Sequence, residues 1–316
     1  QGDIEQIKTY KNTVQGELFS DEFERKVGAS SLMQRAAKET YKKGIPPKEV
    51  LFLVCGIDTQ DDRLSLSVWG VGRPKESDSH NRPEQLYLID RIVLYGNPGR
   101  MDVWNQLDDV LMNAYKNEDG IELKIQAAAI DSGGHFTAEV YSWARDRVAL
   151  GVMPIKGVDR LKGDVMLGKP TKVETGARGR VLKNSVRLYS LGVNKIKTYL
   201  HRRLRDAEPG DGYLHFYPTI TEDYFEELTA EKEVRKYKAG RIHERVWVKK
   251  SGARNEAWDE LVYAYSCVLK IYQTHNRRSM WDNYAKKLLN PTNSSSKKTL
   301  NSKHASSKQA NFVNQW

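Results

Sequence analysis

The stretch Leu51-Phe-Leu-Val-Cys-Gly-Ile-Asp58 decides the fold, because an apolar run with strand character ends abruptly in a carboxylate. A buried, unpaired carboxylate is costly, so we expect Asp58 to lie at the edge of a sheet, close to a partner. The stretch Ile125-Gln-Ala-Ala-Ala-Ile-Asp131 repeats this pattern, and Ser132-Gly-Gly134 follows it. If the two strands run parallel, both carboxylates meet at one sheet edge, where α/β proteins hold their ligands.

A third carboxylate, Asp259, lies in the first turns of a helix predicted over residues 256–272. Glu256 and Glu260 are alternative ligands beside it. Three such carboxylates suit hard divalent cations, and two ions can activate water and stabilise the leaving oxygen of a phosphodiester. The simpler interpretation is also open, since an aspartate can merely end a strand or favour a helix N-terminus.

Size and charge restrict the class of protein. The chain has 316 residues, a formal net charge of +10 and a pI of about 9.3. A basic surface suits a phosphate-rich partner, although many basic proteins bind no nucleic acid. No apolar run approaches the length of a membrane span, so no membrane segment is expected. Cys55 and Cys267 lie in apolar segments and are expected to be reduced core residues, because two cysteines form neither a zinc site nor a disulfide framework.

The order of elements in the first half predicts an α/β core. A three-strand meander is followed by helix, strand, helix and strand, which implies a right-handed crossover between parallel strands. The expected strands are 50–58, 64–70, 85–95, 124–131 and 151–155, and the expected helices are 101–115 and 135–147.

The second half of the chain is less regular. Residues 157–187 are rich in Gly, Lys and Arg, so we expect a mobile basic loop or a loose hairpin. Four of its side chains could follow a DNA backbone, namely Arg178, Arg180, Lys183 and Arg187. Beyond it we expect helices at 193–205 and 222–233, and strands at 213–217 and 241–249.

Three residues near the acids are candidates for orienting water or contacting phosphate: His135, Lys156 and Asp62. Each is otherwise an ordinary solvated residue. Residues 163–170 almost spell a phosphate-binding loop, but Pro170 stands where Ser or Thr would bind magnesium, so we expect no ATPase motor in this stretch.

We expect three regions. Residues 1–49 form a connector, residues 50–273 the main domain, and residues 274–316 a C-terminal extension that is mostly disordered from about 291. The short apolar end at 311–316 is a candidate docking segment.

Five ordered blocks carry a resemblance to a known family. They are Gly56-Ile-Asp-Thr-Gln-Asp-Asp-Arg-Leu64, Ala129-Ile-Asp-Ser-Gly-Gly-His135, Ile155-Lys-Gly157, Leu228-Thr-Ala-Glu-Lys232 and Asn255-Glu-Ala-Trp-Asp259, the last continuing to Val262-Tyr-Ala264. Together they resemble the C-terminal nuclease domain of lambda-type phage terminase large subunits, over about residues 45–272.

The resemblance implies a ribonuclease H-like α/β fold: a central mixed five-stranded sheet of order 3-2-1-4-5, with strand 2 antiparallel, flanked by helices. By position, Asp58, Asp131 and Asp259 match the family's acidic ligands for Mg²⁺ or Mn²⁺, with two ions expected, although Trp258 stands where a small aliphatic residue is usual. The implied activity is endonucleolytic cutting of concatemeric double-stranded DNA for packaging. Implied partners are an N-terminal ATPase domain, the portal protein and the terminase small subunit, in the host cell cytoplasm.

Two alternatives remain open at this point. The same acids would serve another ribonuclease H-like nuclease, such as a resolvase or a transposase. A non-catalytic module that docks DNA or portal could also keep the fold.

Overall fold

A computed structural model describes residues 27–74, 82–159, 161–175, 181–238 and 241–289. The tail predicted to be disordered from about 291, the apolar end at 311–316 and the candidate DNA contacts Arg178 and Arg180 lie outside these residues.

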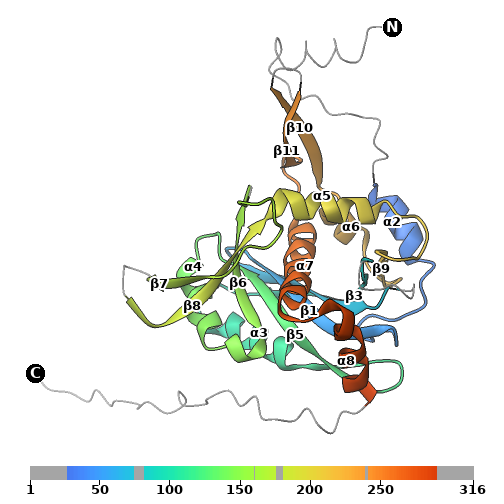
Figure 1. Ribbon diagram of the computed structural model, residues 1–316, viewed down its shortest axis with the longest axis horizontal. Coiled ribbons are helices and arrows are strands. Elements are labelled where there is room, and N and C mark those ends of the chain that lie inside the picture. The colour runs from blue at the N-terminus through green and yellow to red at the C-terminus, as the bar shows by residue number, and fades with distance from the viewer. Residues whose placement is uncertain (1–26, 75–81, 160, 176–180, 239–240, 290–316) are drawn as a thin grey trace, which may run out of the picture.

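A nine-stranded mixed sheet forms the centre of the molecule (Figure 1). Its strands follow the order β7-β8-β6-β5-β1-β2-β3-β9, and β4 pairs with β5 outside this path. The strands are β1 (Val50–Thr59), β2 (Arg63–Gly72), β3 (Gln85–Tyr95), β4 (Ala114–Lys116), β5 (Glu122–Asp131), β6 (Val152–Val158), β7 (Thr171–Thr175), β8 (Val181–Gly192) and β9 (Leu214–Phe216).

The mixed α/β class is as predicted. Within the sheet, β3-β2-β1-β5-β6 keeps the predicted order of the five core strands, with β2 antiparallel to both neighbours. Strand β1 runs parallel to β5, and β5 runs parallel to β6. The sheet is larger than the predicted five strands, because β8 extends it beyond β6 and β9 extends it beyond β3.

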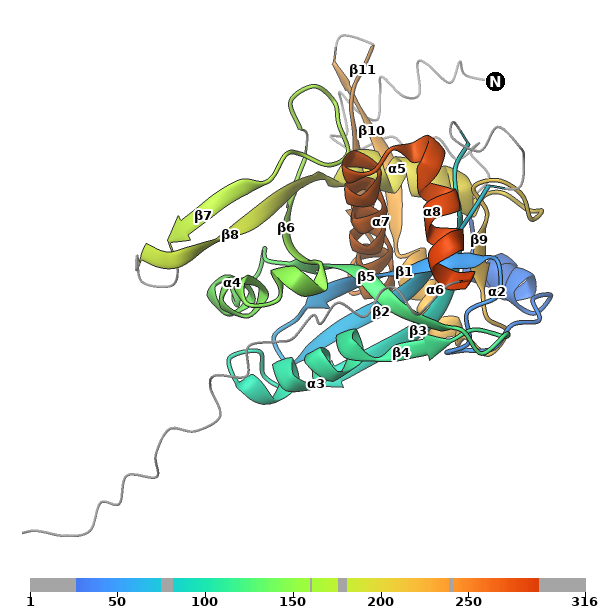
Figure 2. The same cartoon turned by 60° about the horizontal axis from the view of Figure 1, so that its bottom comes forward.

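Helices cover both faces of the sheet. In Figure 2, α3 lies on one face, and α7 and α8 lie on the opposite face. The helices are α2 (Ala29–Ala36), α3 (Met101–Met112), α4 (Thr137–Arg145), α5 (Val193–Leu204), α6 (Glu222–Leu228), α7 (Glu256–Thr274) and α8 (Arg277–Leu289), with one 3₁₀ turn at Val148–Leu150.

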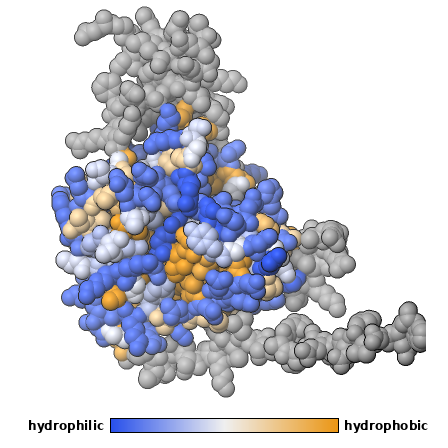
Figure 3. Space-filling view, turned by 180° about the vertical axis from the view of Figure 1, so that it is seen from behind, coloured by the Kyte–Doolittle hydropathy of each residue, from blue (hydrophilic) through white to orange (hydrophobic). Residues whose placement is uncertain are grey.

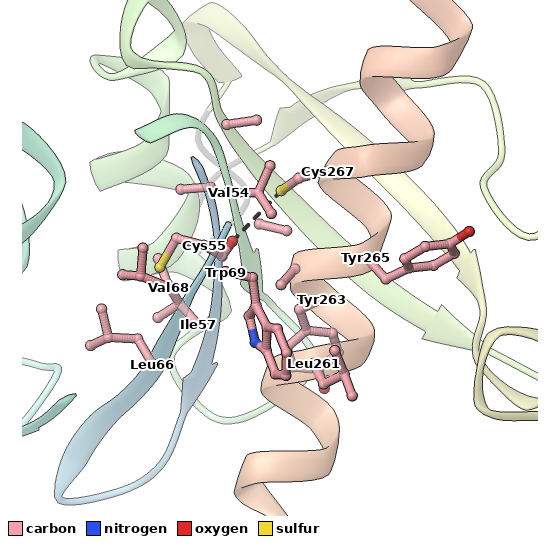
Figure 4. Packing of buried hydrophobic residues seen from close by; sticks show 14 of the residues in the cluster. Val54, Cys55, Ile57, Leu66, Val68, Trp69, Leu261, Tyr263, Tyr265 and Cys267 are labelled. Carbon is pink, nitrogen blue, oxygen red and sulfur yellow. Dashed lines mark hydrogen bonds between the residues drawn. The ribbon is translucent and has the colours of Figure 1, made fainter. Parts of the chain in front are cut away.

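Helix α7 is the main contact between the helices and the sheet. Its apolar face packs on β1 and β2, with Leu261 and Cys267 buried (Figure 4). The Cys267 thiol donates to the Cys55 carbonyl at 3.6 Å, so both cysteines are free core residues, as predicted. The burial of one continuous face explains the 19-residue length of α7, since packing stabilises helices more than propensity does.

The structure corrects one expectation for the second half and decides between two others. The predicted helix at 222–233 ends at Leu228, and residues 231–233 instead begin β10 (Glu231–Lys238), which pairs with β11 (Arg241–Lys249). Pairing between strands overrides the helix propensity of the Glu- and Lys-rich segment here. The basic segment contains a hairpin, β7–β8, and β8 also joins the central sheet.

Helices α2 and α8 contribute to the same hydrophobic core as the sheet. Leu32 of α2 and Trp281 of α8 are fully buried, and Trp281 stacks near Phe52 of β1. The surface seen in Figure 3 is mostly hydrophilic, with a larger apolar area near its centre. In the described part of the chain, no helix is long and apolar enough to cross a membrane.

Candidate active site

Asp58 and Asp131 lie side by side at the ends of two adjacent parallel strands. The β1–β5 register pairs Ile57 with Ile130, so the next residue on each strand is one of the two aspartates. Asp58 is only 5% exposed, and Gln60 donates a hydrogen bond to its carboxylate. Backbone amides of the turn after β5 donate to Asp131. The predicted convergence of these two strand ends is therefore found in the structure.

A glycine in β1 brings the third carboxylate close. A Cβ placed on Gly56 would lie 1.9 Å from the Glu260 carbonyl oxygen, so the backbone of α7 rests directly on the strand at this point. The first turn of α7 contains Asp259, and this contact sets it above the end of β1. Only glycine permits so close an approach.

Burial raises the pKa of all three carboxylates, and the charge of a neighbouring acid adds to each shift. Burial, followed by the charge of Asp259, raises the pKa of Asp58 well above its ordinary value. Burial also raises the pKa of Asp131 to about 6, although backbone amides oppose the shift. For Asp259, burial raises the pKa and Lys197 opposes it. The phenol of Tyr263, one turn further along α7, has a pKa raised first by burial and then by the charges of all three aspartates.

A buried lysine is attached to the third carboxylate. Lys197 of α5 lies 2.8 Å from Asp259 and 2.7 Å from Glu231 of β10. Asn255 donates to the same two carboxylates, at 2.8 Å and 2.7 Å respectively. This network joins α5, the β10–β11 hairpin and α7. It also turns the Asp259 carboxylate toward an ammonium group.

The two alternative glutamates have arginine partners instead. Glu256 lies 2.6 Å from Arg63 and 3.0 Å from Arg254, and despite burial these arginines lower its pKa to about 2. Glu260 is fully buried and lies 3.0 Å from Arg91. Both carboxylates are thus paired with arginines, and among the acids of α7 it is Asp259 whose charge raises the pKa of Asp58 most.

The three residues predicted to orient water or contact phosphate do not all lie beside the acids. Lys156 lies on β6, next to the residue that pairs with Asp131 of β5. Its charge lowers the pKa of the Asp131 carboxyl. His135 is exposed and lies 3.0 Å from Asp61, while Asp62 is exposed and pairs with Arg63 at 2.7 Å. The structure therefore brings Lys156 to the acids, whereas His135 and Asp62 are themselves exposed and pair with Asp61 and Arg63.

Two of the four candidate DNA contacts, Arg187 and Lys183, fall within the described residues, and both lie on the β7–β8 hairpin. Arg187 is exposed on β8, opposite Lys172 of β7. Lys183 also falls within β8. Arg178 and Arg180 lie outside the described residues.

Sequence reasoning missed Lys197 and Glu231. They stand 34 residues apart, and neither has a local pattern that marks it. Glu231 lies inside one of the five blocks that carry the resemblance, which was the available signal. Lys197 interrupts the apolar face of α5, but a single lysine at such a position is usually solvated.

The donor set has the chemistry that a hard divalent cation requires, but its geometry is incomplete. Carboxylate oxygens are the preferred ligands of Mg²⁺ and Mn²⁺. The pKa values of Asp58 and Asp131 are raised first by burial and further by the charge of Asp259, which a bound cation would offset. Among the described residues, however, no three His, Cys, Asp or Glu side chains are arranged to share one ion. Asp259 would have to turn from Lys197 to complete the set.

Comparison with known proteins identifies the family. The model of the endonuclease domain of the terminase large subunit gpA matches residues 1–281. The chain belongs to this family. It is 30% identical over 276 residues to the terminase large subunit of Escherichia phage lambda, covering 84% of this chain and 39% of that protein. It is 28% identical to the terminase large subunit of Enterobacteria phage P21, covering 83% and 38%.

The match covers only part of the length of each relative. The chain spans about two-fifths of the length of the two phage terminase large subunits. No solved structure shows a significant match to it.

Proposed function

We propose that this terminase domain is a Mg²⁺- or Mn²⁺-dependent endonuclease that cuts double-stranded DNA by two-metal hydrolysis on a ribonuclease H-like fold. The observation that carries the proposal is the pair Asp58, which is buried, and Asp131, which is partly buried, at the ends of adjacent parallel strands with raised pKa values. The order of β3-β2-β1-β5-β6 supports the fold assignment.

In this proposal, Asp58, Asp131 and Asp259 hold the metal. A bound divalent ion supplies Lewis-acid activation of water and stabilises the leaving oxygen. Gln60 orients the Asp58 carboxylate through its hydrogen bond, and Lys156 contributes positive charge beside Asp131, where a phosphate would approach. Tyr263 is only 9% exposed and lies close enough for the charges of all three aspartates to raise the pKa of its phenol.

For the whole protein we propose the role that the family resemblance implies. The domain would cut concatemeric genomes for packaging in the host cell cytoplasm, with an N-terminal ATPase domain, the portal protein and the small subunit as partners. Residues 1–49 would be the connector, residues 50–273 the nuclease domain and residues 274–316 an extension. Family membership favours this role over a resolvase or a transposase.

Plasmid digestion tests the activity. We expect nicking and linearisation with Mg²⁺ or Mn²⁺ and none with EDTA. Asp131→Asn should lose cleavage, whereas Glu122→Gln, an exposed change at the opposite end of the same strand, should keep it.

A calorimetric titration with Mn²⁺ separates a nuclease from a docking module. Wild type should bind Mn²⁺ and Asp131→Asn should bind it much more weakly. A wild-type chain that neither binds Mn²⁺ nor cuts DNA would point to the non-catalytic docking module.

A further inference from the structure

A polar hollow of about 170 Å³ lies between α5 and the β10–β11 hairpin. Three arginines, a histidine, a threonine and a glutamate line it. They are Thr198, His201, Arg202, Arg205, Glu233 and Arg245. The residues come from two elements that are far apart in the sequence. In Figure 1 the hairpin rises from the body of the molecule beside α5. This concentration of positive charge lies outside the β7–β8 hairpin, where the sequence placed the DNA contacts.

The walls of the hollow are fixed in place. Thr198 donates to one oxygen of Glu233 at 2.5 Å, and Arg245 donates to the other at 3.5 Å. The Trp247 indole donates to Thr198 at 3.2 Å and also packs beside His201. Both oxygens of the glutamate are therefore engaged, and the net charge of the lining remains positive.

Basic residues near a helix C-terminus have a simpler explanation, because they favour the negative end of the helix dipole. Here, however, Arg35 donates to the Leu204 carbonyl at 2.6 Å at this helix end. Arg203 points elsewhere, pairing with buried Glu84 at 2.7 Å. In addition, Arg245 comes from the hairpin and has no role in capping α5. The dipole alone does not account for the convergence.

The hollow is connected to the candidate active site through α5. Lys197, which contacts Asp259, precedes Arg202 by five residues on this helix, and it precedes Arg205, the residue that follows the last residue of the helix, by eight. At 1.5 Å per residue these spacings are about 7.5 Å and about 12 Å. Phosphates follow one strand of a duplex every ~3.4 Å along the axis. Lys249, at the base of β11, adds positive charge that lowers the pKa of Asp259.

We propose that this hollow, formed by Arg202, Arg205 and Arg245, binds the phosphodiester backbone of duplex DNA about two to four nucleotides from the scissile phosphate. Arginine suits this role, because its planar fork bonds phosphate oxygens in pairs. The proposal rests on the proposed function for DNA as the ligand, but it concerns binding and not cleavage.

Equilibrium binding of a short fluorescent duplex in EDTA tests the hollow without any cleavage. The salt dependence of binding is measured for wild type and for the double variant Arg202→Gln/Arg245→Gln. Loss of two phosphate contacts should flatten the slope of log K against log salt by about 2. Because the measurement needs no metal, a failure of the nuclease assignment leaves its result unaffected.

Two matched variants distinguish a built site from net charge. Lys116→Gln/Lys124→Gln removes the same charge from exposed positions on β4 and β5, and it should leave the slope within about one of wild type. Arg202→Lys/Arg245→Lys keeps the charge and should restore most of the slope. Circular dichroism and melting should show all variants folded, since Arg245 is exposed and its contact with Glu233 is long, at 3.5 Å, so that it contributes little stability.

Two outcomes of the salt titration would overturn the proposal. A wild-type slope in the glutamine variant, or equal flattening in the Lys116/Lys124 control, would show that the hollow does not bind the backbone. Calorimetry with ATP and with inorganic phosphate tests for a free-phosphate site. Tight binding of either, lost in the glutamine variant while duplex binding is unchanged, would overturn the assignment to duplex DNA.

Discussion

We expect Asp58 to destabilise the fold in the absence of metal. Asp58 is buried beside two other acids, and burial together with the charge of Asp259 raises its pKa well above the ordinary value. Replacing it with a neutral side chain removes the cost of a buried charge. A functional residue of this kind can be recognised because it lowers the free energy of unfolding. The sequence already indicated this, since it places a carboxylate at the end of an apolar strand.

We predict opposite effects of Asp58→Asn on stability and on activity. In EDTA near neutral pH, the variant should unfold at the wild-type temperature or up to a few degrees higher. Cleavage should fall by about 10²-fold or more, since one preorganised electrostatic group is lost. Melting with and without Mn²⁺ checks the cause: wild type should be stabilised by the ion through mass action, and the variant should not. A variant that melts well below wild type in EDTA would mean that Asp58 has a structural role.

Lys197 has the opposite character, because two buried acids depend on it. Removing one partner of a buried ion pair typically costs about 3–5 kcal/mol. We expect Lys197→Met to destabilise the chain by about 3 kcal/mol in urea unfolding. The double variant Lys197→Met/Glu231→Gln should recover part of that loss, because one of the stranded carboxylates is removed. Equal stability of the single and double variants would contradict the coupling.

At the scale of elements, the contact of α7 with β1 determines whether the three acids meet. A methyl group on Gly56 would collide with the α7 backbone at Glu260, and neither element can move alone. We expect Gly56→Ala to cost about 3 kcal/mol and to reduce cleavage as Asp259 is displaced. Gly210→Ala, where a Cβ meets nothing within 4 Å, is the matched control and should behave as wild type. A stable, active Gly56→Ala protein would show that the contact is not needed.

The Glu256 clamp links β2 to α7 and should make stability depend on acid pH. Its pKa is lowered from 4.5 to about 2, mainly through Arg63 and Arg254 acting against burial. A lowered carboxyl pKa contributes stability above the unfolded value, which is lost as pH falls through about 4.5 toward 2. The full contribution is about 3 kcal/mol. Urea unfolding at about pH 6 and pH 3 should show a smaller loss in Glu256→Gln than in wild type. Parallel losses would rule out this carboxyl as a cause.

The elements that sequence predicted correctly share a local signal. The apolar strands β1 and β5 and the apolar face of α7 can be recognised from residues close together in the chain. The β10 strand could not be, because its Glu- and Lys-rich sequence suits a helix and its pairing with β11 is settled by cross-strand contacts such as Val234 with Val246. The Lys197 network could not be predicted from the sequence for the same reason. It joins three elements through side chains that follow no spacing pattern.

At the scale of the molecule, the main domain predicted from the sequence, residues 50–273, omits two helices that pack on its core. Leu32 of α2 is fully buried, and Arg35 bonds the Leu204 and Leu214 carbonyls at 2.6 Å and 3.0 Å. On α8, Trp281 is fully buried beside Phe52. Removing these helices would expose apolar surface that the sheet now buries, and the domain boundary proposed from sequence can be tested on this basis.

We predict that a chain of residues 27–289 folds with the stability of the full chain, whereas residues 50–273 alone are less stable by several kcal/mol. Losing one large buried aromatic costs about 3–5 kcal/mol, and the shorter chain loses Trp281 together with Leu32 and the Arg35 hydrogen bonds. Urea unfolding of the two fragments and the full chain measures the difference. Full-chain Trp281→Ala separates packing from length, because it should reproduce most of the loss due to α8 with no residue removed. If residues 50–273 unfold at the same urea concentration as the full chain, α2 and α8 are peripheral and the narrower domain boundary is correct.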